Sequence, residues 1–135
     1  RAGANSLKQP LRMTRLRQAI ALLLDQPELA FEAAQLPHDW EDEDNPGAPL
    51  LRQLLDAVNA DPEISSAALC ERWRDTEHEA VIRRLSDSRL IDHIPEEGRK
   101  VVFIDALHGL NADAARARRA RMIAQAIQAS ENGLH

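Results

Sequence analysis

Aromatic residues are scarce in this 135-residue sequence, which contains no tyrosine, two phenylalanines and two tryptophans. β-Strands draw on aromatic and β-branched residues, whereas the strong helix formers alanine, leucine, arginine, glutamine and glutamate dominate here. The composition therefore predicts an all-α protein. Its length fits one domain, because folded domains typically hold roughly 100 to 200 residues.

Cysteine and long apolar runs are also scarce. The single cysteine, Cys70, cannot form an intramolecular disulfide, and the longest apolar run, residues 19–24, is far shorter than the roughly 20 residues that cross a bilayer. The N-terminus lacks the apolar core of a secretion signal. We therefore expect a cytoplasmic protein without a membrane span.

The motifs that carry catalysis or cofactor binding are missing as well. The five histidines never stand in an HExxH or CxxC context, and the five glycines are isolated, which argues against a zinc site and a phosphate loop. The acidic run at residues 41–44 lacks the ligand spacing of a calcium loop, and we interpret it as a solvated loop. We expect no catalytic residues and no cofactor, since an unrecognised enzyme would need a perturbed acid or base in a pocket.

Charge is distributed unevenly around a net value of −5. Residues 1–20 carry five basic side chains and no acid, whereas residues 25–79 carry fifteen acids against three arginines. Four arginines also cluster at residues 116–121. Such a cluster can contact phosphates, but arginines there also favour the helix dipole and cover apolar surface with their stems, and we prefer this second interpretation.

Prolines and apolar spacing predict a compact bundle of about six helices with short connections. Residues 1–9 show no periodicity and are interpreted as a flexible linker remnant, which leaves residues 10–135 as one helical protein-interaction domain. The predicted helices span residues 11–24 and 27–36, begin at Pro49, at Ser65 or Ser66 and at a Thr76–Glu79 capping box, and end with a long helix over residues 101 to about 130. Residues 36–49 are predicted to be loop throughout.

The first predicted helix carries the best candidate site. Arg12, Leu16 and Ile20 lie four residues apart and share one face, with Arg17 beside them. Positive charge at one end and apolar surface at the other suit an acidic peptide that ends in an apolar residue. In the alternative interpretation, Leu16 and Ile20 are core residues and the arginines are solvated.

Residues 11–30, LRMTRLRQAIALLLDQPELA, resemble the opening of the C-terminal domain of bacterial DNA primase, DnaG. Residues 50–61, Asp75-Thr76 and residues 82–86 resemble later segments of that family in the same order. The resemblance implies a helical bundle similar to the N-terminal domain of the replicative helicase, followed in the family by a helical hairpin that grips the helicase. The hairpin would begin near Gly133, so we expect it to be truncated here. Primer synthesis, the nucleotidyltransferase reaction of primase, belongs to other domains.

The resemblance also implies two partners and a binding site. The partners are the DnaB-type replicative helicase and the acidic C-terminal tail of single-stranded-DNA-binding protein. We expect no direct nucleic-acid contact, and we expect the domain alone to be a monomer. Carried onto this sequence, the tail pocket consists of Arg12, Arg15, Leu16, Arg17, Ile20, Arg84 and Leu85. Two alternatives remain: the N-terminal domain of a replicative helicase, and a helical DNA-binding module that uses the arginines at residues 116–121.

Overall fold

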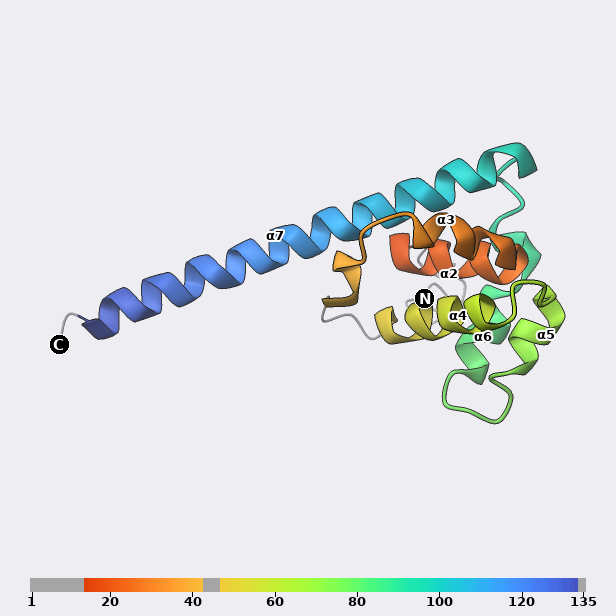
Figure 1. Ribbon diagram of the computed structural model, residues 1–135, viewed down its shortest axis with the longest axis horizontal. Helices are drawn as coiled ribbons and strands as arrows, with labels where there is room; N and C mark the ends of the chain where they lie inside the picture. Colours follow the sequence, from red (N-terminus) through yellow and green to blue (C-terminus); the bar gives the residue numbers. More distant parts are fainter. Residues whose placement is uncertain (1–13, 43–46, 134–135) are drawn as a thin grey trace, which may run out of the picture.

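The computed structural model describes residues 14–42 and 47–133, and in these ranges it is all-helical (Figure 1). The prediction of about six helices ending in a long one is confirmed. The α-helices are α2 (Arg15–Asp25), α3 (Ala30–Ala34), α4 (Ala48–Ala60), α5 (Ser66–Glu71), α6 (Glu79–Leu85) and α7 (Arg99–Gly133). Short 3₁₀ helices join them: η1 (Pro27–Leu29), η2 (Asp39–Asp42), η3 (Ser88–Leu90) and η4 (Glu96–Gly98).

Helix α2 forms the centre of the bundle and contacts α4, α5, α6 and α7. Its run of small and branched apolar residues, 19–24, is almost fully buried. Each fully buried leucine or isoleucine stabilises the fold by about 1.5–3 kcal/mol relative to an exposed one. The Oγ1 of Thr14 accepts a hydrogen bond from the backbone N–H of Arg17 at 3.2 Å and caps the helix. The helix was predicted to begin at residue 11, but it begins at Arg15 because the backbone of Thr14 is extended; residues 11–13 lie outside the described residues.

Local signals place the next three helices. Pro27 begins η1, which continues into α3, and Pro49 lies in the first turn of α4. Ser65 caps α5 by accepting a hydrogen bond from the N–H of Ala68 at 3.1 Å. The hydroxyl of Ser66 donates to the carbonyl of Leu24, which fastens α5 to the end of α2.

The start of α6 differs from the predicted capping box. Thr76 Oγ1 accepts from the N–H of His78, and the Glu79 carboxylate accepts from the N–H of Asp75 at 3.0 Å. Asp75 has a φ of 65°, and this left-handed residue turns the chain so that the helix begins only at Glu79. The two side chains therefore satisfy other backbone donors than those predicted.

The predicted loop at residues 36–49 contains a core residue. Trp40, in η2, is 2 % exposed, and its backbone N–H donates to Oδ1 of Asn111 at 3.0 Å. The Nδ2 of the same asparagine donates to the carbonyl of Pro37 at 2.9 Å. Asn111 thus fastens this segment to the middle of α7.

Helix α7 has a packed half and a bare half. Its buried residues end at Ala114, and every residue from Arg119 to Gly133 is exposed. Figure 1 shows the bare half projecting away from the bundle. The bundle therefore accounts for the fold of α7 only up to about Arg118.

Candidate peptide-binding groove

A groove of about 670 Å³ opens between α2, α6 and the first turn of α4. Pockets that bind small ligands typically measure roughly 300–1,000 Å³, so this groove can hold a few side chains. Its floor consists of buried apolar side chains, and its rim carries polar side chains together with one exposed valine. The floor residues are Leu16, Ile20, Leu50 and Leu85, and the rim residues include Thr14, Arg17, Glu77, His78 and Val81.

Helical spacing brings these side chains to one place. Leu16 and Ile20 lie one turn apart on α2, and Val81 and Leu85 lie one turn apart on α6. A smaller recess of about 50 Å³ adjoins the groove and is lined by Arg17, Arg84, Val81 and Leu85. Two guanidinium groups from different helices therefore border the same apolar floor.

The structure places the predicted site residues as follows. Leu16, Arg17 and Ile20 of α2 meet Leu85 in the groove, and Arg84 joins them in the adjoining recess. Arg12 lies outside the described residues.

Arg15 points elsewhere, because neighbouring residues on a helix are about 100° apart around its axis. Its Nη1 lies 3.1 Å from Oδ2 of Asp113 on α7. Arg15 therefore joins α2 to α7 and does not line the groove.

Several groove residues escaped the sequence analysis. Leu50 belongs to the apolar stripe of α4, and nothing in that stripe distinguishes it from the other leucines. Glu77 and His78 lie in the turn before α6, and the histidine Nε2 is 3.7 Å from the glutamate Oε2. Among the described rim residues, Glu77 carries the one negative charge.

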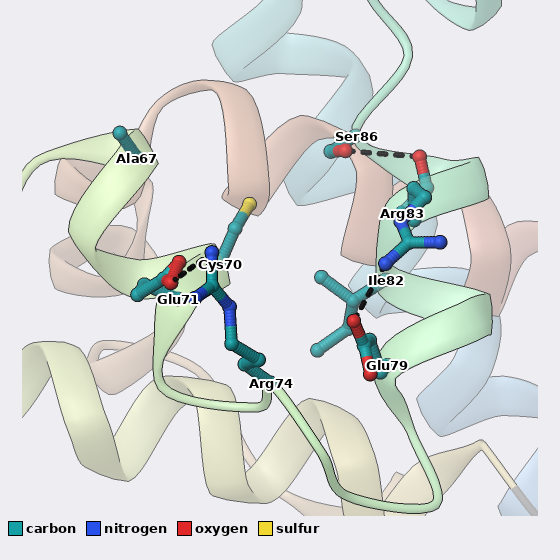
Figure 2. Close-up of a pocket in the computed structure, with 8 residues that line it drawn as sticks. All are labelled: Ala67, Cys70, Glu71, Arg74, Glu79, Ile82, Arg83 and Ser86. Atoms are coloured by element: carbon teal, nitrogen blue, oxygen red, sulfur yellow. Dashed lines mark hydrogen bonds and ion pairs between the residues drawn. The ribbon is translucent and has the colours of Figure 1, made fainter.

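A second crevice, of about 200 Å³, lies between α5 and α6 (Figure 2). Figure 2 shows Arg74 beside Glu71 and Arg83 beside Glu79, with nitrogen–oxygen distances of 2.7 and 2.6 Å. Burial raises the pKa of the Cys70 thiol, and a hydrogen bond with Ser86 lowers it by a smaller amount. The charges of this crevice are therefore paired with one another, and its thiol stays protonated at neutral pH.

Metal-binding and membrane-spanning features were also sought. Within residues 14–42 and 47–133, no three histidine, cysteine, aspartate or glutamate side chains gather closely enough to hold a metal ion. In the same ranges, no helix combines the length and apolarity that a membrane span needs.

Comparison with known proteins identifies the family. The chain matches a family described as "DNA primase DnaG DnaB-binding" over residues 16–132. Among solved structures it is similar to the DnaG primase C-terminal domain from Vibrio cholerae, with 26% identity, a TM-score of 0.68 and 83% of each chain covered. A comparison with curated protein sequences found no match. Because the family match spans most of the sequence, the chain belongs to the DnaB-binding family of DNA primase DnaG.

Proposed function

We propose that this chain docks a DNA primase on the replicative DnaB-type helicase and that its α2–α6 groove binds the acidic C-terminal tail of single-stranded-DNA-binding protein. Primer synthesis would thereby be coupled to DNA unwinding, while this domain catalyses no reaction itself. Membership of the DnaB-binding family supports the helicase contact. The observation that carries the tail contact is the pair Arg17 and Arg84 beside one apolar floor.

The groove offers the chemistry that such a tail needs. A guanidinium group forms charge-assisted hydrogen bonds with aspartate side chains and with a terminal carboxylate. The floor of Leu16, Ile20 and Leu85 accommodates the ring of a terminal phenylalanine, which loses its contact with water there. One buried ring and a few exposed ion pairs give roughly −7 to −8 kcal/mol, which corresponds to micromolar binding.

The bare half of α7 supports the helicase contact. Met122, Ile123 and Ile127 are 62, 55 and 55 % exposed. Ile123 and Ile127 are four residues apart and therefore share one face of the helix. Exposed branched residues along one face of a helix are typical of a helix that packs against another helix in a complex.

Titration of a fluorescein-labelled acidic peptide ending in Asp-Phe tests the tail site. Arg84→Ala removes a guanidinium from the recess, and Arg83→Ala removes the same charge from the next residue, which faces the α5–α6 crevice and pairs with Glu79. We expect the peptide affinity to fall about tenfold for Arg84→Ala, which corresponds to about 1.4 kcal/mol, and less than twofold for Arg83→Ala. Equal losses in the two variants, or no binding to the folded wild type, would refute the tail site.

A further inference from the structure

A third groove, distinct from the α2–α6 groove and the α5–α6 crevice, lies between α3 and the C-terminal end of α4 and has a volume of about 200 Å³. Phe31 and Ala34 line it from α3, and Val58 lines it from α4, with Pro62 just beyond that helix. Phe31 is 68 % exposed, more than any other large apolar side chain in residues 14–42 and 47–133. The exposed ring at the edge of this groove offers a ligand an apolar anchor.

Three carboxylates at or next to this groove form no ion pair with the described part of the chain. Most of the described carboxylates between residues 25 and 71 form ion pairs within the chain, namely those of Asp25, Glu32, Asp39, Glu41, Asp56 and Glu71. Glu28, Asp61 and Glu63 form none with the described residues. Glu28 lines the groove, and the other two flank Pro62 in the sequence.

The end of α4 adds negative potential to the same place. A helix C-terminus carries a partial negative charge of about half an elementary charge, which basic side chains in the last turn commonly offset. The last turn of α4 contains no basic residue, and its C-cap is Asp61. Apolar surface and uncompensated negative charge therefore coincide at this groove.

We propose that the α3–α4 groove docks a basic amphipathic helix of a partner protein. An apolar side chain of that helix packs on Phe31, and its lysines or arginines face Glu28, Asp61 and Glu63. Arginine or lysine next to an apolar anchor is the one combination that satisfies both features of this surface.

This surface is separate from the α2–α6 groove. Leu50 lines the α2–α6 groove and Val58 lines the α3–α4 groove. At a rise of 1.5 Å per residue, these two positions are about 12 Å apart along α4. The charges of the two grooves are opposite, so one ligand does not suit both. The proposal therefore does not depend on the function proposed above.

A designed probe tests the α3–α4 groove directly. The probe is a fluorescein-labelled peptide with lysines and leucines at helical spacing, compared with a peptide of equal charge in which serines replace the leucines. We expect Phe31→Ser to weaken binding of the leucine peptide at least tenfold and Glu28→Gln to weaken it several-fold. We expect the serine peptide to bind the wild type at least tenfold more weakly than the leucine peptide.

Two matched variants make the test specific. Val101→Ser removes an apolar side chain that is 59 % exposed, and Glu96→Gln removes an exposed carboxylate that has no ion pair among the described residues. Both should change the affinity less than twofold. Equal losses for Glu28→Gln and Glu96→Gln would show that only total charge matters, and this result would overturn the proposal. Absence of binding, or a concentration-dependent dimer that Phe31→Ser abolishes, would overturn it too.

Discussion

The guanidinium group of Arg15 extends across Gly109 and reaches the carboxylate of Asp113 at 3.1 Å, which joins the first turn of α2 to the middle of α7. A Cβ atom at residue 109 would lie 2.3 Å from both Cδ and Nε of Arg15. Glycine therefore leaves the space through which the arginine reaches its partner, at the cost of a weaker helix.

Gly109→Ala should show a coupling with Arg15. Alanine stabilises a helix interior by about 1 kcal/mol relative to glycine, so we expect Gly109→Ala to raise the free energy of unfolding by about that amount in an Arg15→Ala background. In the wild-type background the gain should be smaller, because the new methyl group displaces the arginine from Asp113. An exposed pair of this kind contributes about 0–1 kcal/mol. Urea unfolding of the four proteins measures the coupling, and strictly additive effects would contradict it.

Asn111→Ala should loosen η2 from α7. The substitution leaves the N–H of Trp40 and the carbonyl of Pro37 without their partner, and we expect a loss of about 1–3 kcal/mol in the free energy of unfolding. Asn59→Ala, at an exposed position of α4, is the matched control for helix propensity. If the two variants unfold at the same urea concentration, Asn111 does not hold this segment.

Glu77→Gln should strengthen binding of the acidic peptide. Its side chain is 85 % exposed on the rim of the groove, so removing its charge should raise the affinity a few-fold at low salt. The difference should vanish at about 1 M salt, where the screening length is only about 3 Å. An unchanged affinity at low salt would place the peptide away from this rim.

Substitutions on the bare half of α7 should weaken the helicase contact. A double variant, Ile123→Asp with Ile127→Asp, puts two charges on the apolar face without touching the bundle. We expect at least a tenfold loss of affinity for the DnaB-type helicase in surface plasmon resonance, and less than a twofold loss for Val101→Asp on the packed half. Circular dichroism should show that both variants stay helical. Unchanged affinity of the double variant would assign the helicase contact to another surface.

Cys70 should react slowly with alkylating reagents. Burial raises its pKa, so the reactive thiolate is rare at neutral pH and the rate should rise as the pH increases. The hydrogen bond with Ser86 lowers this pKa, so Ser86→Ala should raise it and slow the reaction at pH 8 further. Ser130→Ala, on the bare half of α7, is the control. Iodoacetamide labelling followed by mass spectrometry measures the rate, and a faster reaction of Ser86→Ala would contradict the assignment.

The fold was predictable where short-range signals determine it. Pro27, Pro49 and Ser65 act within one helical turn, and the spacing of Leu16, Arg17 and Ile20 places them on neighbouring parts of one helix. Long-range relationships were not predictable. The local sequence pattern does not predict that Trp40 is buried in the core while its backbone bonds to Asn111. It also does not predict that Leu50 joins the floor of the groove.

Periodicity and spacing could not predict two further features: the start of α6 and the full set of residues at the candidate site. The predicted capping box was wrong because Asp75 adopts a left-handed conformation. Aspartate can adopt this conformation, but its presence in a sequence does not predict it. The inclusion of Arg84 and Leu85 in the site rested on resemblance alone, and periodicity could not have connected them with α2. Arg15 was grouped with that site from the resemblance, whereas its interaction with Asp113 depends on a glycine far along the chain.

The bare half of α7 has a mechanical consequence. From Arg119 to Gly133 the helix spans about 21 Å at 1.5 Å per residue, and its base is fastened to the bundle by Asn111 and by Arg15. A rod of this length works as a lever, since a tilt of about 10° at the base moves the tip by about 4 Å. A small change in how η2 packs against the helix would therefore displace the tip by a larger distance than the base.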